Sequence, residues 1–166
     1  MIEYTVIMTP TSTSWILDGK FHREDGPAFT RTSGLEEWYL NGDRHRTDGP
    51  AVTCENGDKE WYLNDKRHRA DGPAVEDADG TKQWFVHGKI HREDGPANVR
   101  GDGFKSWWLN DKRHRADGPA VEDTDGTKQW WLNGEEVTEA EVMTPTKEMT
   151  IAQLEAKLGH KIKVVK

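Results

Sequence analysis

Large apolar side chains recur along this chain at a constant spacing. Six of the tryptophans stand 23 residues apart, and a leucine or valine follows each of them two residues later: Trp15 and Leu17, Trp38 and Leu40, Trp61 and Leu63, Trp84 and Val86, Trp107 and Leu109, Trp130 and Leu132. Successive side chains of a strand point to opposite faces of a sheet, so each tryptophan shares a face with its leucine or valine. A fixed period of this length predicts a repeat array, in which every unit buries its apolar face against its neighbours.

The position between the tryptophan and the leucine is always bulky, but its identity changes along the array. It holds Ile16, Tyr39, Tyr62, Phe85, Trp108 and Trp131. Two interpretations are open. These residues form a second packed stripe, under loops or against the C-terminal tail, or they form an exposed aromatic ladder that binds a partner. Soluble proteins rarely leave large apolar patches bare without a partner, so the packed stripe is the simpler interpretation.

Turn-forming residues divide each unit into short strands. In the unit that begins at Pro50, residues 51–53 form a strand, Asn56-Gly57 forms a two-residue turn, and residues 58–63 form the second strand. A turn at Asn64-Asp65 leads to a short segment over residues 66–69, and a tight loop follows in which glycine supplies free φ and proline removes a donor. The predicted fold is all-β: a single-layer, twisted array of antiparallel β-hairpin repeats, about 50 Å long.

The two ends of the chain depart from this pattern. Residues 1–14 precede the array, and the alternation of Tyr4, Val6 and Met8 with Thr5 and Ile7 predicts a capping strand. Residues 15–134 hold five repeats and a final half repeat. Residues 135–166 are expected to form a small helix-strand cap: a helical turn capped at residues 138–141, a helix that starts at the capping box of residues 150–153, and a strand at residues 162–165. This segment is either a lid on the sheet or a docking element.

Composition restricts the classes of function. The net charge of −7 argues against a general nucleic-acid binder and against an anionic membrane surface. Cys54 is the one cysteine, so no intrachain disulfide can form and nothing points to an oxidising compartment. The first ten residues do not resemble a signal peptide, and no stretch is long enough to span a bilayer. The expected location is the cytoplasm.

The spacing resembles that of MORN repeats, which share the 23-residue period. Each MORN repeat is a β-hairpin with an NGK-type turn, a following histidine and a second glycine turn, and the matching run here is Asn41-Gly42, His45 and Asn56-Gly57. The chain departs from the usual pattern in two ways. HRxDGPA, for example residues 91–97, stands where MORN repeats carry a short His-Gly-Lys-Gly, and tryptophan fills the aromatic slot. The array therefore resembles a divergent MORN-like subfamily, which implies scaffolding and protein contacts. With its tail MTIAQLEAKLGHKIKVVK, it is similar to small uncharacterised bacteriophage proteins.

Each HRxDGPA motif contains residue types that also serve catalysis, for example His68, Arg69 and Asp71. If each unit adds at least two strands, equivalent residues lie about 10 Å apart, so histidines of different copies cannot share a metal ion. Any site would have to exist once per copy. We therefore predict a structural role, in which the aspartate accepts from loop N–H groups and the arginine pairs with it. A calcium loop that begins at Asp77 would need Glu at its twelfth position, which is Gly88. No catalytic residue, metal or cofactor is expected.

The expected function is that of a non-enzymatic interaction protein. Its protein partner would contact the aromatic ladder, which comprises Tyr39, Tyr62, Phe85, Trp108 and Trp131. The resemblance to phage proteins implies a phage-encoded chain that binds or inhibits a defence-related host protein in the host cytoplasm. The alternative is a sponge for nucleotides or single-stranded nucleic acid, held beside the ladder by a basic stripe. The binding arginines of this stripe would be Arg46, Arg69, Arg92 and Arg115, and further basic residues join them: Lys20, Arg44, Lys66, Arg67, Lys89, Lys112 and Arg113. The sequence leaves the identity of the partner and the oligomeric state open.

Overall fold

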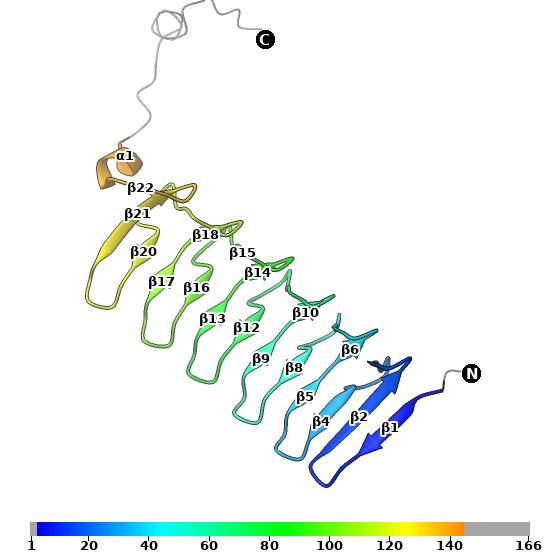
Figure 1. The fold of residues 1–166 in the computed structure, drawn as a ribbon. Coiled ribbons are helices and arrows are strands. Elements are labelled where there is room, and N and C mark those ends of the chain that lie inside the picture. Colours follow the sequence, from blue (N-terminus) through cyan, green and yellow to red (C-terminus); the bar gives the residue numbers. More distant parts are fainter. Residues whose placement is uncertain (1–2, 145–166) are drawn as a thin grey trace, which may run out of the picture.

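The computed structural model describes residues 3–144 of the 166-residue chain. Within this range the protein is an elongated, twisted array of antiparallel hairpins that ends in one short helix (Figure 1). The predicted all-β hairpin array is therefore confirmed. The helix expected to start at residues 150–153 and the strand expected at residues 162–165 lie outside the described residues.

The main sheet has 14 strands, and every pair of neighbouring strands is antiparallel. The strands follow one another in chain order, so each long hairpin pairs with the next one (Figure 1). They are β1 (Thr5–Met8), β2 (Ser12–Leu17), β3 (Lys20–Phe21), β4 (Phe29–Arg31), β5 (Glu36–Glu37), β8 (Val52–Thr53), β9 (Lys59–Glu60), β12 (Val75–Glu76), β13 (Lys82–Gln83), β16 (Asn98–Val99), β17 (Lys105–Ser106), β20 (Val121–Glu122), β21 (Lys128–Leu132) and β22 (Glu135–Val137).

Between consecutive long hairpins the chain forms a short hairpin, and four of these form two-stranded sheets of their own. Their turns have positive φ at both central residues, for example 50° at Asn64 and 61° at Asp65, which is the geometry of tight β-hairpin turns. The four short hairpins are β6 (Tyr39–Leu40) with β7 (Asp43–Arg44), β10 (Tyr62–Leu63) with β11 (Lys66–Arg67), β14 (Phe85–Val86) with β15 (Lys89–Ile90), and β18 (Trp108–Leu109) with β19 (Lys112–Arg113). They form a row beside the main sheet (Figure 1).

The strand expected over residues 58–63 is interrupted at Trp61, where the backbone changes partners. Strand β9 pairs with β8 and β12, whereas β10 pairs with β11. At the break, the Trp61 N–H donates to the Ala74 carbonyl at 2.8 Å, and the Trp61 carbonyl accepts from the His68 N–H at 3.0 Å. The tryptophan is thus fixed by the loop that follows it in the chain, and this arrangement separates the long hairpin from the short one.

Backbone hydrogen bonds also connect each short hairpin to the next. The Arg46 N–H donates to the Tyr62 carbonyl at 3.1 Å, and the Asp65 N–H donates to the Arg44 carbonyl at 2.9 Å. The same two bonds recur at every later step of the array. Each copy therefore contacts its neighbours through both hairpins, as expected for a linear repeat protein.

The most deeply buried side chains are small. The alanines that end the HRxDGPA motifs are fully buried, and valines of the main sheet accompany them: Ala28, Ala51, Ala74, Ala97 and Ala120 at 0% exposure, and Val52, Val75 and Val121 at 4–8%. The periodic tryptophans are half-buried. The core is therefore a row of small buried residues along the array, and in the one cluster around Ala51 and Val52 larger side chains such as Tyr62 and Trp38 pack against it.

The array ends differently at its two termini. Strand β1 pairs with β2 at the N-terminal end, as the alternation of Tyr4, Val6 and Met8 predicts. At the other end, helix α1 (Glu139–Met143) follows β22 and begins with a capping box, in which the Thr138 side chain and Glu141 each accept from the other's backbone N–H. This confirms the predicted capped turn. No helix among residues 3–144 has the length and apolar character needed to cross a membrane.

Candidate binding surface

The HRxDGPA loop and the tryptophan form one packed unit in every repeat. The guanidinium of Arg69 lies over the Trp61 ring with its Cζ 4.1 Å from the ring centroid, and the corresponding distances in the other four copies are 3.9–4.2 Å. Its Nε donates to Asp71 at 2.9 Å and its Nη1 donates to the Pro73 carbonyl at 3.2 Å. A guanidinium held by a ring face, a carboxylate and a carbonyl has little freedom left.

The glycine of this motif has a different role from the one expected. Gly72 is not in the positive-φ region, and the same holds for its four equivalents. A Cβ atom built on Gly72 would lie 2.9 Å from Cζ of Arg69, and the equivalent distances are 2.7–3.1 Å. The expectation that this glycine supplies free φ is therefore wrong. Glycine is needed because the guanidinium packs directly against the backbone.

The histidine of the motif connects one copy to the next. Nδ1 of His68 accepts a hydrogen bond from the backbone N–H of His87 at 3.1 Å, in the turn of the following short hairpin. The other four histidines accept from the equivalent asparagine N–H at 3.0–3.4 Å. Burial, together with the nearby His87 ring, lowers the pKa of His68 below its ordinary value. Thus the histidine, arginine and aspartate of each motif all serve contacts within the array. The arginine–aspartate pair is present as predicted, but the aspartate accepts from the arginine Nε and not from the loop N–H groups that were expected to bind it.

The ladder residues point to the opposite face, where arginines alternate with them. Tyr62 lies across the short hairpin from Arg67, and the Arg67 guanidinium lies 5.6 Å from the Phe85 ring of the next copy. Arg44 lies in the same way 5.2 Å from the Tyr62 ring. Arg113 lies between two tryptophans, 5.2 Å from the Trp108 ring and 5.1 Å from the Trp131 ring. At the N-terminal end Phe21 takes the place of the arginine and lies 5.2 Å from Tyr39.

The polar partner of each ladder residue changes together with it. In one copy Tyr62 donates to Glu60 at 2.6 Å, and Nη2 of Arg67 lies 3.0 Å from the same carboxylate. Burial and this hydrogen bond raise the pKa of the Tyr62 hydroxyl, so it stays protonated at neutral pH. In this copy, the positive charge of Arg67 beside the ladder is therefore neutralised by Glu60.

The next two copies use other combinations. Phe85 needs no acceptor, and its copy has Gln83 and Ile90 where Glu60 and Arg67 stand. In the copy after that, the Trp108 indole donates to the fully buried Ser106 at 2.8 Å. Arg113 then has no carboxylate ion pair within residues 3–144, whereas Arg44 and Arg67 have Glu37 and Glu60. The C-terminal part of the ladder therefore carries a positive charge that its own copy does not neutralise.

The ladder is neither bare nor covered by loops or by the part of the tail that the structure describes. Tyr62 is 8% exposed, and the remaining ladder residues are half-buried. Two shallow hollows lie between successive short hairpins on this face. One of about 460 Å³ is bordered by Tyr62, Arg67 and Phe85, and one of about 520 Å³ by Trp108, Arg113 and Trp131. Within residues 3–144, the ladder rings pack against the ladder's own arginines.

A comparison with protein-family models and one with curated proteins each found no match to this chain.

The arginines of the basic stripe lie on the tryptophan face, away from the ladder. Arg46, Arg69, Arg92 and Arg115 each stack on a tryptophan and pair with an aspartate, and their side chains are 23–26% exposed. The arginines that do lie beside the ladder are Arg44, Arg67 and Arg113. The sequence contains the signal for them, because a two-residue turn at Asn64-Asp65 places Tyr62 directly opposite Arg67.

Two further candidate features of residues 3–144 are the Cys54 thiol and a possible metal-binding cluster. Cys54 is half-buried, and burial, then the acidic groups led by Asp58, raise the pKa of its thiol, which disfavours the reactive thiolate. Among residues 3–144, no group of three or more histidine, cysteine, aspartate or glutamate side chains could hold a metal ion.

Proposed function

We propose that this protein is a non-enzymatic, repeat-type binding protein that engages a partner protein through its aromatic ladder. One observation carries the proposal. The tryptophan face repeats its arginine–tryptophan stacking and its arginine–aspartate pair in all five copies, and only a second carboxylate differs, on Arg69 and Arg115. The ladder face instead changes along the array, from tyrosine with a glutamate to Phe85 and then to Trp108 with Ser106. Specific recognition needs such differences, and packing of identical repeats does not. The MORN-like period and the similarity to phage proteins support a phage-encoded chain that binds a host protein involved in defence and inhibits it.

The part of the ladder with the strongest binding character is the group of Trp108, Arg113 and Trp131. Tryptophan and arginine are the residue types most enriched among those that dominate binding energy. The hollow that they border is open, and Arg113 forms no ion pair within residues 3–144, although Asp111 and Glu135 also border the hollow. A partner that offers an apolar side chain and a carboxylate would satisfy both features. We therefore expect Tyr62, which is buried and bonded to Glu60, to contribute less to binding than Trp108.

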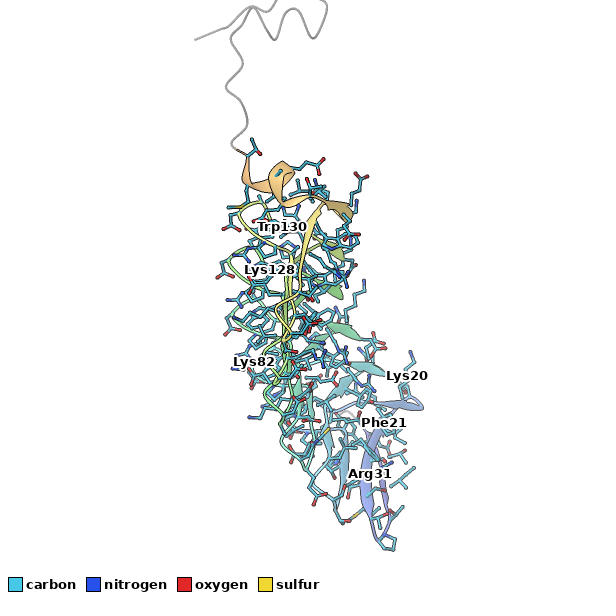
Figure 2. All side chains as sticks on the ribbon, turned by 90° about the vertical axis from the view of Figure 1, so that its left-hand side faces the viewer. Lys20, Phe21, Arg31, Lys82, Lys128 and Trp130 are labelled. Carbon is cyan, nitrogen blue, oxygen red and sulfur yellow. The ribbon has the colours of Figure 1, made fainter. Side chains whose placement is uncertain are left out.

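Variants of the ladder test this proposal. Proteins from host cells would be captured on the wild-type chain, identified by mass spectrometry, and tested as purified partners by calorimetry. We expect Trp108→Ser and Arg113→Gln to weaken binding of that partner at least about tenfold, the scale of a residue that dominates an interface. The control residue is Lys82, which belongs to strand β13 of the main sheet and not to a short hairpin; Figure 2 shows it on the same side of the array as Lys128. The control Lys82→Ser should bind as the wild type does.

The outcomes separate the competing explanations. If Trp108→Ser stays folded by circular dichroism and binds with unchanged affinity, the ladder is not the binding surface. Titration with nucleotides and single-stranded oligonucleotides at low salt tests the alternative ligand class. We expect no saturable binding, because the stripe arginines already contact tryptophan rings and aspartates. If a nucleotide or oligonucleotide binds saturably and Arg69→Gln abolishes this binding, the ligand of this protein is a nucleotide or nucleic acid and not a protein.

A further inference from the structure

The outer edge of strand β1 has no neighbouring strand among the described residues, and it is unusually apolar. All four of its side chains are exposed. Three of the five exposed large hydrophobic side chains within residues 3–144 belong to it: Val6 at 42%, Ile7 at 48% and Met8 at 76%. No charged residue stands between Glu3 and Asp18. Uncharged, exposed edges of this kind pair with other strands unless something blocks them.

The pairing of β1 with β2 determines which backbone N–H and C=O groups of β1 point outward from the sheet. The Thr9 N–H donates to the Ser12 carbonyl at 2.8 Å, so Thr9 forms a hydrogen-bonded pair with β2. In an antiparallel pair such residues alternate with residues whose N–H and C=O point away from the partner strand. The outward-pointing groups are therefore those of Tyr4, Val6 and Met8. They form a regular row of donors and acceptors along the edge.

The opposite end of the array is protected in a way that β1 is not. Strand β22 carries Glu135 and Glu136, and helix α1 beyond it begins with Glu139 and Glu141. Charges on an edge strand, and a helix next to it, are two ways in which proteins prevent edge pairing. Of the two sheet ends within residues 3–144, only the N-terminal one combines free backbone groups with uncharged side chains.

We propose that two copies of this chain associate by antiparallel pairing of β1 with β1 about a twofold axis. In the register that pairs all the outward groups, Val6 lies opposite Val6 of the second copy, and Met8 lies opposite Tyr4. This register places apolar side chains against each other across the axis. A self-complementary contact of this type closes after two copies. Head-to-tail pairing would instead bring β1 to the acidic β22.

The dimer has a consequence for binding. The twofold axis of an antiparallel pair stands perpendicular to the sheet, so both aromatic ladders would lie on the same side of one continuous sheet. A partner with two equivalent sites would then bind with increased avidity. A four-residue strand is only about 13 Å long, so the contact is smaller than a standard interface and the dimer is expected to be weak. The dimer itself does not depend on the proposed binding function.

Charge substitutions at the symmetric position test the pairing directly. Sedimentation velocity of the full chain from about 5 to about 500 μM should show a reversible dimer that grows with concentration. Val6→Lys and Val6→Glu each place like charges opposite each other and should weaken dimerisation on the order of tenfold or more. An equimolar mixture of the two variants should restore it as a heterodimer. Met143→Lys, which changes an exposed apolar residue of α1, is the matched control and should leave dimerisation unchanged.

Several results would overturn the proposal. These are a wild type that stays monomeric throughout the range, a Val6→Lys variant that dimerises normally, oligomers larger than the dimer, or a mixture of the Lys and Glu variants that fails to associate. Circular dichroism shows whether each variant is folded. If Val6→Lys fails to fold, Met8→Lys serves in its place, because Met8 is more exposed and also points its backbone groups outward. Met8→Lys places a charge on the paired edge opposite Tyr4 of the second copy, so a dimer as strong as that of the wild type would count against the pairing.

Discussion

The two faces of the array both place arginines over aromatic rings, but the contacts are uniform on one face and variable on the other. On the tryptophan face, Arg69 stacks on Trp61 and binds Asp71, and the other four copies repeat these contacts with nearly equal distances. On the ladder face, Arg67 contacts Phe85 of the next copy, and its neutralising group is present in some copies and missing in others. Arginine over an aromatic ring is thus a fixed internal contact on one face and a variable surface feature on the other. Uniformity marks the face that holds the array together.

The largest effect is expected from removing a ring on the uniform face. Trp61→Ala takes away a half-buried ring and releases the Arg69 guanidinium, and we expect it to lower the free energy of unfolding by about 3 kcal/mol. Trp108→Ala on the ladder should cost less, because that ring borders an open hollow. Urea denaturation of both variants measures the difference. Equal losses would show that the ladder is as much a part of the core as the tryptophan row.

Replacing the motif glycine by alanine tests which of two reasons requires glycine there: close packing of the guanidinium or a special backbone conformation. Gly72→Ala forces the Arg69 guanidinium off its position, at an expected cost of about 1–2 kcal/mol. In the background of Arg69→Met the same change should cost much less, because the flexible side chain no longer fills the space. The double-mutant cycle by thermal or urea unfolding gives the coupling energy. A coupling near zero would contradict the close-packing explanation.

Loss of the ladder carboxylate should have a modest effect. Glu60→Gln removes the ion pair with Arg67 and weakens the acceptor of the Tyr62 hydroxyl, and both partners are partly exposed. We expect a loss of at most about 1 kcal/mol in the free energy of unfolding. Gln83 already stands at the equivalent position beside Phe85, which shows that the fold accommodates glutamine there. A loss of several kcal/mol would mean that this ladder contact is essential to the fold.

The smallest expected effect concerns pH. The pKa of His68 is lowered from its ordinary value of 6.5 by burial and by His87, so the unfolded chain binds a proton more readily than the folded one. The neutral His68 ring therefore makes its full contribution to the free energy of unfolding above about pH 6.5, and this contribution decreases as the pH falls below that value. His87→Asn, which matches the asparagine of the other copies, should raise the pKa of His68 towards 6.5 and reduce this dependence. NMR titration of the His68 ring measures the change, and an unchanged pKa would assign the shift to burial alone.

Much of the fold could be predicted because it depends on local patterns. The spacing of Trp61 and Leu63, the Asn64-Asp65 turn and the alternation of β1 indicate strands and hairpins without knowledge of distant contacts. The candidate site was predicted less completely. Its aromatic residues were found from the period, and Arg67 was counted in the basic stripe, but the contact of Arg67 with Phe85 depends on the distance between consecutive copies, which no single unit encodes.

The sequence by itself determined the period, the all-β class and the face on which each aromatic residue lies, because strand alternation follows from the backbone alone. Only the tertiary structure decided where the strand breaks, why Gly72 is glycine, and which edge is open. Two of those features arise where groups separated in the sequence meet: the Trp61 backbone with Ala74 and His68, and the Arg69 guanidinium with the Gly72 backbone. The open edge depends on the order of the strands, because no strand among the described residues pairs with the outer side of β1.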